Sequence, residues 1–259
     1  MSNNSLDVLA DRLSQRASLT DEDRAALTML PYVRRILNPH TYLVREGEMP
    51  RPYCSLVLSG LAYRHKLALD GKRQIVSIHL TGDLLDLQHL FLNVADHSVQ
   101  ALTELVVADI DRNALQDIAL SRPAVGRALW VDGLIDASIY REWVLNVGRR
   151  DGRARIAHIL CELAVRMRAA GIADSISFRL PMTQEQLGDA TGLTGVHVNR
   201  MVKSLVADGL IEHSGRTIAI RDWEGIRREG DFNPLYLHLD QVAPRFDVPL
   251  SALFDETME

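Results

Sequence analysis

The chain contains little cysteine and no long apolar run. Its 259 residues include two cysteines, Cys54 and Cys161, too few for a four-thiolate metal or iron–sulfur site within one chain. No stretch reaches the roughly 18 uninterrupted apolar residues that span a bilayer, so we expect no membrane partner. The first residues lack the basic flank and apolar segment of a signal peptide, and a reducing cytoplasm is the expected location.

Familiar catalytic patterns are missing as well. The sequence has no nucleophile elbow, no Walker motif and no Rossmann glycine motif. It also lacks the His-x-His pair with which barrel-shaped oxygenases bind metal. We therefore expect no enzyme, no catalytic residue and no metal site.

Charge is unevenly distributed along the chain. The formal net charge is −5, which by itself speaks against a nucleic-acid partner. Residues 145–221, however, hold 11 lysines and arginines against 7 acidic residues, a net of +4, and the remainder carries −9. This asymmetry indicates a mildly basic module attached to an acidic body.

The N-terminal part shows signals for one helix followed by strands. Thr20 precedes three acidic residues, which predicts a capped helix that Pro31 ends. Short runs that alternate or are wholly apolar predict strands over 41–44, 54–58, 61–65, 73–79, 98–102 and 106–110. Glycines at positions 47, 60, 71 and 82 separate several of these runs. Short strands at such spacing are typical of a β-sandwich or barrel.

A long helix is predicted over residues 123–149, which contain no proline after Pro123. One apolar stripe, which we assign to dimerisation, consists of Val131, Leu134, Ile135, Ser138 and Ile139. The stripe is widened by Trp130, Ala137 and Val144. A helix this apolar must bury two sides, one against the barrel and one against a second copy. A single broad contact with the core is the alternative.

Residues 182–207 carry the pattern of a helix-turn-helix. Thr183 and Gln186 form a capping-box pattern, Gly192 lies in a short turn, and Thr194 is placed to cap a second helix. The second helix has an apolar side at helical spacing, made of Val198, Met201, Val202 and Leu205. Its polar side lies near the helix N-terminus, as in DNA-binding units. A packed helical hairpin with a solvated face is the alternative.

The polar side carries residues suited to reading DNA. Arg200 has two donors for guanine O6 and N7, Asn199 suits adenine, and the Val196 methyls suit a thymine methyl. Thr183 and Lys203 are placed to hold phosphates. The predicted interface also includes Thr194, Gly195 and His197 in the first turn of the second helix.

Two segments follow the helix-turn-helix. The runs 210–213 and 217–220 flank Ser214-Gly215-Arg216, which predicts a hairpin wing with Arg216 placed for a phosphate. Residues 230–259 contain six acidic residues against one arginine. We predict an irregular tail packed by Tyr236, Leu237, Leu239 and Phe246 and assign it no function.

Several motifs together resemble the CRP/FNR family of bacterial transcription regulators. They are TQEQLGDATGLTGVHVNRMVKSLVADGLI, the wing GRTIAI, the hinge DGRARIAHILCELA and the barrel segment GDLLDLQHLF. The resemblance implies an α+β fold: a jelly-roll (double-stranded β-helix) sensor domain over 1–122, a dimerisation helix over 123–149, and a winged helix-turn-helix over 150–229, followed by the acidic extension 230–259. It further implies a homodimer on a two-fold symmetric operator of double-stranded DNA, a contact with RNA polymerase, and a small-molecule effector near the barrel.

The effector positions depart from the family pattern. The glutamate and the Arg-Ser pair that hold a cyclic nucleotide fall near Asp86, Leu87, His97 and Ser98. Leucine cannot accept the ribose hydrogen bond, and histidine is a poorer phosphate clamp than arginine. No cysteine precedes Cys54, so the N-terminal ligands of an iron–sulfur cluster are absent. We therefore expect neither cAMP, cGMP nor a cluster, and the cofactor is left unassigned.

Two other readings of the sensor domain stay open. In one, the barrel is purely structural in an effector-independent regulator; in the other, it holds haem through one of His65, His79, His89 and His97. The recognition helix also departs from the family, since Gly195 and Val196 stand where Arg or Val and then Glu are frequent. Without that glutamate, recognition of cytosine is lost, so the operator should differ from the best-known half-sites.

Overall fold

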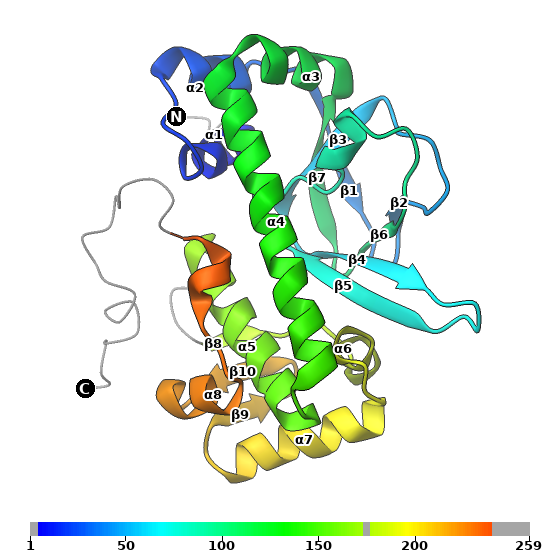
Figure 1. Cartoon of the computed structure of the whole chain (residues 1–259), viewed down its shortest axis with the longest axis vertical. Coiled ribbons are helices and arrows are strands. Elements are labelled where there is room, and N and C mark those ends of the chain that lie inside the picture. Colours follow the sequence, from blue (N-terminus) through cyan, green and yellow to red (C-terminus); the bar gives the residue numbers. More distant parts are fainter. Residues whose placement is uncertain (1–4, 173–176, 240–259) are drawn as a thin grey trace.

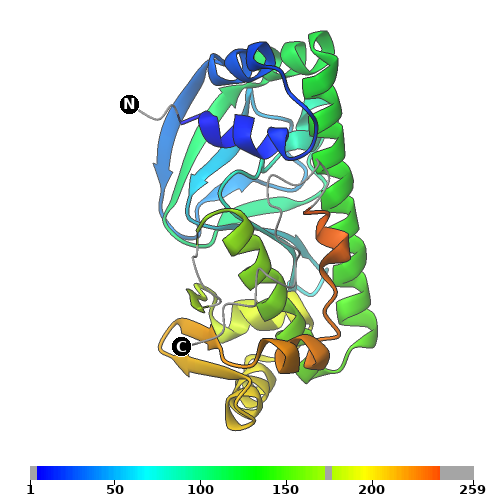
Figure 2. The ribbon, with the colours of Figure 1, turned by 90° about the vertical axis from the view of Figure 1, so that its left-hand side faces the viewer.

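The computed structural model describes residues 5–172 and 177–239. A β-rich domain and a smaller α/β module both pack on one long helix, α4 (Pro123–Arg149), which runs along the molecule (Figure 1). In the orthogonal view α4 forms one edge of the molecule over its whole length (Figure 2). One side of this helix therefore covers the two domains, and the other side faces outward.

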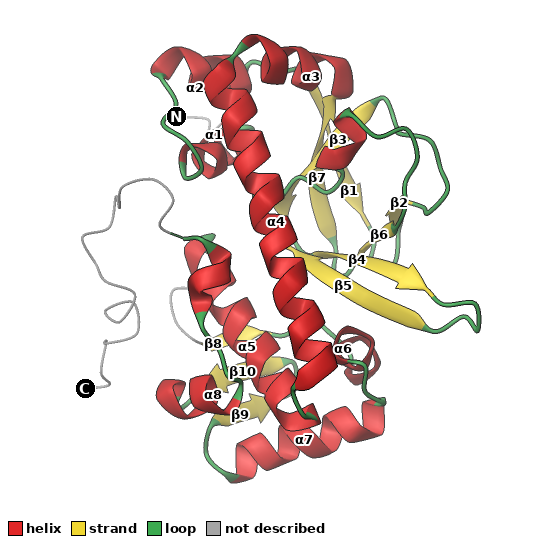
Figure 3. Cartoon of the chain, viewed as in Figure 1, coloured by secondary structure: helices red, strands yellow, loops and turns green. Residues whose placement is uncertain are grey.

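The N-terminal domain is a jelly-roll of two antiparallel sheets (Figure 3). The first sheet has the order β1 (Tyr32–Leu37), β7 (Leu105–Asp111), β3 (Tyr53–Ser59). The second has the order β2 (Tyr42–Val44), β6 (Ser98–Ala101), β4 (Ala62–Leu67), β5 (Arg73–His79). Gly60 makes the turn between β3 and β4 with φ +87°, and a Cβ there would lie 2.2 Å from the Glu104 carbonyl oxygen. The six predicted strands are confirmed, whereas β1 was not expected.

Helices close the ends of this domain. They are α1 (Asp7–Ser14), α2 (Asp21–Thr28), α3 (Arg112–Ser121) and the short 3-10 helix η1 (Leu87–Leu90). The predicted cap of α2 is confirmed, because the Thr20 hydroxyl accepts from the Asp23 amide and the Asp23 carboxylate accepts from the Thr20 amide. The sequence analysis missed α1 and α3.

A sharp break separates α4 from α5 (Gly152–Ala169). Arg150 is extended, with φ −76° and ψ 149°, and the Asp151 carboxylate caps α5 by accepting from the Arg153 and Ala154 amides. Because this cap restarts the helix in a new direction, α5 turns back under the barrel and carries the C-terminal module with it (Figure 1).

The C-terminal module combines helices with a small antiparallel sheet. Its helices are α6 (Gln184–Thr191), α7 (Gly195–Ala207), α8 (Trp223–Glu229) and the 3-10 helix η2 (Pro234–Leu237). Its sheet has the order β8 (Ser177–Arg179), β10 (Thr217–Ile220), β9 (Ile211–Ser214). The wing hairpin β9–β10 is confirmed, and β8 is an additional strand that the sequence did not predict.

The hydrophobic core is continuous between the barrel and the C-terminal module. Tyr63 and Ile78 of the barrel share one cluster with Ile139 of α4 and with the buried face of α5. Phe232, Tyr236 and Leu237 belong to the same cluster, so the first part of the acidic extension is an integral part of the module. Phe246, which was predicted to pack the tail, lies outside the described residues.

Candidate nucleic-acid interface

The geometry of α6 and α7 follows from their caps and two glycines. Thr183 caps α6 in a capping box with Gln186, and the Thr194 hydroxyl accepts from the His197 amide at the start of α7. Gly192 joins the two helices with φ +68°, in the left-handed region that glycine tolerates best. The angle between the helices is set by Gly188, where a Cβ would lie 2.4 Å from the Leu193 carbonyl oxygen.

The two sides of α7 are separated as the sequence predicts. Val198, Val202 and Leu205 are buried, and Met201 is half-buried. The opposite side is exposed at Val196, Arg200 and Lys203, with Val196 at 83% exposure. A valine so exposed stabilises nothing inside the chain. The outward side of α7 therefore offers methyl groups, one guanidinium and one ammonium on a single helical face.

Residues at the start of α7 differ in how far they are exposed. Thr194 is exposed, whereas Gly195, His197 and Asn199 are half-buried. A Cβ at Gly152 would lie 2.9 Å from His197 Nε2, so the His197 ring leans on the first turn of α5. Arg200 Nη2 lies 3.4 Å from the same ring nitrogen. His197 thus lies between the hinge and Arg200 and is less free than the sequence pattern implies.

The wing places Arg216 at an exposed turn. Gly215 adopts φ +60° in this turn, and Arg216 and Thr217 are both exposed. The Arg216 backbone carbonyl accepts from the Leu180 amide at 2.7 Å, which ties the turn to the segment after β8. The Arg216 side chain therefore extends from a fixed backbone, on the same module as α7.

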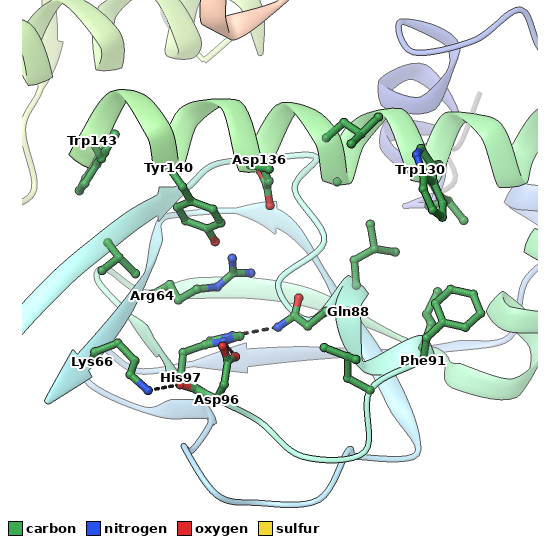
Figure 4. A pocket seen from close by; sticks show the side chains of 18 of the residues that line it. Arg64, Lys66, Gln88, Phe91, Asp96, His97, Trp130, Asp136, Tyr140 and Trp143 are labelled. Atoms are coloured by element: carbon green, nitrogen blue, oxygen red, sulfur yellow. Dashed lines mark hydrogen bonds and ion pairs between the residues drawn. The ribbon is translucent and has the colours of Figure 1, made fainter. Parts of the chain in front are cut away.

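A large groove lies between the barrel and α4 (Figure 4). Its volume is about 1340 Å³, and its lining is mostly apolar. Of the residues assigned to an effector from the sequence, Leu87 and His97 line this groove. His97 Nε2 lies 2.9 Å from Gln88 Nε2, and His97 Nδ1 lies 2.6 Å from Asp96 Oδ1, so both ring nitrogens are engaged.

The other two assigned residues lie behind the groove wall. Asp86 is buried and accepts from the Cys54 thiol at 2.9 Å and from the Ser55 amide at 3.0 Å. The Ser98 hydroxyl accepts from the Glu46 amide. Neither residue is among those that line the groove, because their polar atoms are directed into the barrel wall. Their assignment to ligand contact is therefore a correction: in this structure they hold the wall together.

Burial perturbs the titration of several of these groups. Burial raises the pKa of Asp86 to about 6, although the bonds from Cys54 and Ser55 favour its ionised form. Burial and the nearby Arg64 charge lower the pKa of His97 to about 4, against the attraction of Asp96. The His97 ring is thus neutral near pH 7, and it cannot hold an anion by charge.

Several residues that line the groove were not predicted from the sequence. Arg64 on β4 and Asp136 and Tyr140 on α4 bring polar atoms to its centre, and Trp130 stands at one end (Figure 4). The only signal for Arg64 was its position inside a predicted strand of the barrel, where burial of a guanidinium is unusual. Asp136 and Tyr140 were not predicted because the sequence pattern of α4 is dominated by its apolar residues.

The apolar stripe assigned to dimerisation on α4 needs correction. Ile135, Ser138 and Ile139 are buried inside the chain, where the two isoleucines pack with the barrel and α5. Val131 is half-buried against the same cluster, and Leu134 is exposed at 55%. Four of the five assigned residues therefore lie on the core side of the helix, and only Leu134 is exposed.

The outward face of α4 has its own apolar repeat. Trp130 and Val144 are each 73% exposed, and Ala137 is half-buried midway between them. These three residues are seven positions apart, the repeat of helices that pair in a coiled coil. With Leu134 they form the surface that we call the outer stripe, and all four of these residues also line the groove between α4 and the barrel. Exposed apolar side chains gathered on one helix face are typical of an interface.

Metal sites and membrane spans were also sought. Among residues 5–172 and 177–239, no group of three or more histidine, cysteine or acidic side chains could hold a metal ion. His89 and His97 stack with ring centroids 6.1 Å apart, without a third such ligand. No helix of the described chain is long and apolar enough to cross a bilayer.

Comparison with known proteins supports both halves of the chain. Residues 34–122 match the cyclic nucleotide-binding domain family, and residues 154–229 match the Crp-like helix-turn-helix domain family. The chain is similar to the transcriptional activator protein FnrL of Cereibacter sphaeroides, with 29% identity over 82% of this chain and 86% of the relative. It is also similar to the transcriptional activator protein Anr of Pseudomonas aeruginosa, with 28% identity over 79% of this chain and 83% of the relative.

The chain is also similar in fold to solved structures. The structure of FixK2 from Bradyrhizobium japonicum matches with a TM-score of 0.70 and 28% identity, over 77% of this chain and 97% of that chain. A CooA mutant from Carboxydothermus hydrogenoformans matches with a TM-score of 0.62 over 89% of this chain, and its 18% identity bears on the fold alone.

Proposed function

Because the chain belongs to the CRP/FNR family of transcription regulators, we propose that it acts as a homodimer on a two-fold symmetric operator and that an effector bound in the barrel groove modulates it. DNA binding by its helix-turn-helix is the premise. The dimer, the contacted bases, the effector and a contact with RNA polymerase are the proposal. We further propose that the protein works in the cytoplasm and catalyses no reaction.

The exposed side of α7 is the observation that carries the DNA proposal. Arg200 and Lys203 are exposed, and neither takes part in an ion pair among the described residues. These two exposed cations and the exposed Val196 on one helical face suit a major groove, where Arg200 would read a guanine. Thr183, Thr194 and Arg216 would hold phosphates on either side of it.

The outer stripe supports the dimer. It is an apolar repeat that the chain leaves exposed or half-buried, and it belongs to α4, the helix that forms one edge of the molecule (Figure 2). Pairing through this face would place two α7 helices on the same side of the dimer. Two-fold symmetric proteins of this kind bind half-sites about one helical turn of DNA, roughly 34–36 Å, apart.

Selection of bound sites from random DNA by the purified full-length protein tests the proposal. We expect a two-fold symmetric sequence with a guanine in each half-site. The selection is run at moderate ionic strength, with and without a cell extract of small molecules, so that a requirement for an effector is detected. Enrichment of a single asymmetric half-site would contradict the dimer, and no enrichment under either condition would contradict the function.

Two further possibilities stay open for the barrel. In one, it serves only for assembly, and no small molecule changes DNA binding. In the other, it holds haem through a histidine, for which the stacked pair His89 and His97 beside the groove is the relevant observation. An absorption spectrum of the purified protein after haem addition separates the second possibility from the first.

A further inference from the structure

Arg64 is a buried cation without an acidic partner. It lies on β4 with 6% exposure and directs its guanidinium toward α4 (Figure 4). One terminal nitrogen donates to the Leu85 carbonyl oxygen at 3.0 Å, while Nε has no hydrogen-bond partner. No acidic side chain of the described residues forms an ion pair with it. Arginine stays charged even when buried, so this guanidinium has donors to spare.

Tyr140 on α4 faces Arg64 across the groove. The Arg64 guanidinium carbon lies 5.6 Å from the centroid of the Tyr140 ring, and the Tyr140 hydroxyl is buried without a hydrogen-bond partner. A buried hydroxyl is normally paired, so two unused donors on opposite walls of one groove are unusual. Arg64 comes from the barrel and Tyr140 from the long helix, so an acceptor placed between them would connect the two parts.

The other charged groups of the groove are either engaged or acidic. Lys66 contacts the Glu46 carboxylate and the Asp96 carbonyl oxygen, and Asp96 contacts His97. Asp136, one turn before Tyr140 on α4, also faces the groove (Figure 4). Burial raises the pKa of Asp136, whereas the nearby Arg64 charge acts to lower it. Two nearby carboxyl groups disfavour a multiply charged ligand, and one unpaired guanidinium suits a single negative charge.

Apolar side chains continue from this polar centre. Leu87 and Leu90 of η1 and Leu129 of α4 line the groove beyond Gln88, and Phe91 and Trp130 stand at its mouth (Figure 4). Such a site has one polar end and a long apolar body, the usual plan of a small-molecule pocket.

We propose that the groove binds a singly charged amphipathic carboxylate, whose carboxylate group is held by Arg64 and Tyr140 and whose apolar body lies along Leu87, Leu90 and Leu129. Planar pairing of a guanidinium with a carboxylate is the strongest contact available to Arg64. This assignment rests on the proposed effector function of the same groove and names the chemical class of the effector.

Binding of dodecanoate to the full-length protein tests the assignment. Trp130 and Trp143 line the groove, so their fluorescence reports binding, and calorimetry gives the dissociation constant. Dodecanoate is used below its micelle concentration and compared with dodecan-1-ol, which has the same chain without the charge. Hydrogen bonds between two charged groups are stronger than those to a neutral hydroxyl. We therefore expect dodecanoate to bind at least about tenfold more tightly than dodecan-1-ol.

Variants distinguish a specific contact with Arg64 from non-specific hydrophobic binding of the ligand. Arg64→Gln should weaken dodecanoate binding about tenfold or more, and Tyr140→Phe, which keeps the ring, about threefold. The matched control is Arg34→Gln on the exposed side of β1, which should leave binding unchanged. Thermal melting checks that each variant is folded. Equal affinity for dodecanoate and dodecan-1-ol would overturn the proposal, and so would unchanged affinity in a folded Tyr140→Phe or Arg64→Gln protein.

Failure of this inference is distinguishable from failure of the proposed function. Site selection on random DNA without dodecanoate addresses only the regulator. A selected operator together with no dodecanoate binding would overturn the carboxylate assignment and leave the regulator standing. Dodecanoate binding that follows the Arg64 and Tyr140 variants supports the assignment, even if the operator then proves to need a different inducer.

Discussion

Arg200 and Lys203 lie three positions apart on α7, and both are exposed, but they are expected to act in different ways. The guanidinium of Arg200 has a planar set of donors that matches the edge of a guanine, whereas the ammonium of Lys203 is a compact charge that suits a phosphate. His197 lies 3.4 Å from Arg200 and restrains it on one side. Specificity and salt dependence should therefore separate between these two residues.

Replacing Arg200 with alanine should relax specificity at one base pair per half-site. We expect a loss of about 1–3 kcal/mol of discrimination there, because a bidentate contact to guanine disappears. Competition binding with operators changed at each position measures the loss. The exposed Arg34 on β1 supplies the control, since Arg34→Ala should change nothing. Uniform weakening over all sequences would instead assign Arg200 to a phosphate.

Replacing Lys203 with alanine should lower the salt dependence of operator binding and leave the preferred sequence unchanged. Each phosphate contact contributes about 0.9 to the slope of log affinity against log salt, so the slope should fall by about one per subunit. Titrations at several salt concentrations measure it. Lys72, at the tip of the β4–β5 hairpin, is the matched control because it is a similarly exposed lysine. A slope that stays the same would remove Lys203 from the DNA backbone contacts.

Single residues were predictable where local rules decide their position. The caps at Thr20, Thr183 and Thr194 follow from the sequence because they depend on neighbours within three residues. Arg64 could not be assigned to the groove in the same way. Its surroundings come from α4 and from the segment around Leu85, which are distant in the sequence, and only the folded chain brings them together.

At the scale of elements, α4 shows how one helix can carry two apolar faces. Ile135 and Ile139 pack inside the chain, and the outer stripe lies beside them on the same helix. The sequence predicts a helix that must bury two sides, but apolar spacing alone does not say which side meets which partner. That choice depends on where the barrel and α5 lie.

Charges placed on the two faces of α4 should have opposite consequences. Leu134→Glu puts a carboxylate on the outward face, so we expect a folded monomer that binds the operator weakly. Ile135→Glu buries a carboxylate in the core and should instead lower the thermal stability strongly, because an unpaired buried charge is costly. Light scattering and thermal melting distinguish the two. A stable dimer of the Leu134→Glu protein would place the dimer interface elsewhere.

Regular elements were predicted better than those at domain edges. The six strands with alternating or apolar runs were found, whereas β1 was missed because it reads Tyr-Val-Arg-Arg-Ile-Leu, with Val33, Arg34 and Ile36 all exposed. An edge strand whose side chains face solvent shows no clear alternation. β8 is only three residues long, which is too short for any period to appear.

In the whole molecule, ion pairs cross between parts that also share a hydrophobic core. Asp83, at the turn before η1, lies 2.9 Å from Arg12 of α1 and 3.2 Å from Arg166 of α5. Arg73 of β5 lies 2.7 Å from Asp189 of α6. The barrel thus contacts both the hinge helix and the first helix of the helix-turn-helix. These ion pairs join the groove-bearing domain to the DNA-binding module.

Buried histidines should make the whole chain less stable in mild acid. Burial lowers the pKa of His97 and His158 to about 4, while an unfolded histidine titrates near 6.5. Between pH 6.5 and pH 4 these histidines bind protons in the unfolded state but stay neutral in the folded state. Their contribution to the free energy of unfolding is therefore complete above about pH 6.5 and falls toward pH 4. The carboxyls of Asp86, whose pKa is raised to about 6, and of Asp136, whose pKa is also raised, oppose this effect. Burial also lowers the pKa of three further histidines, His65, His79 and His89, so the histidines outnumber the two carboxyls.

Urea unfolding at several pH values between 7.5 and 5 measures this effect. We expect the midpoint to fall with pH and the fall to be smaller in His158→Gln. That variant removes the buried imidazole ring. In the native protein His158 Nδ1 lies 3.1 Å from the Gly230 carbonyl oxygen, and His158 Nε2 lies 3.1 Å from the Tyr236 hydroxyl. A midpoint that rises as the pH falls would contradict the expectation.

The packing of Tyr236 bears on how shortened versions of this protein should be made. Its hydroxyl donates to Glu162 at 2.8 Å, and the Trp143 indole donates to the same carboxylate at 3.0 Å. A fragment trimmed at residue 229, where the matched helix-turn-helix region stops, would leave that buried carboxylate short of a donor and uncover the apolar pocket of Leu237. An expression fragment meant to be soluble should therefore end after residue 239, and an affinity tag is better placed beyond it.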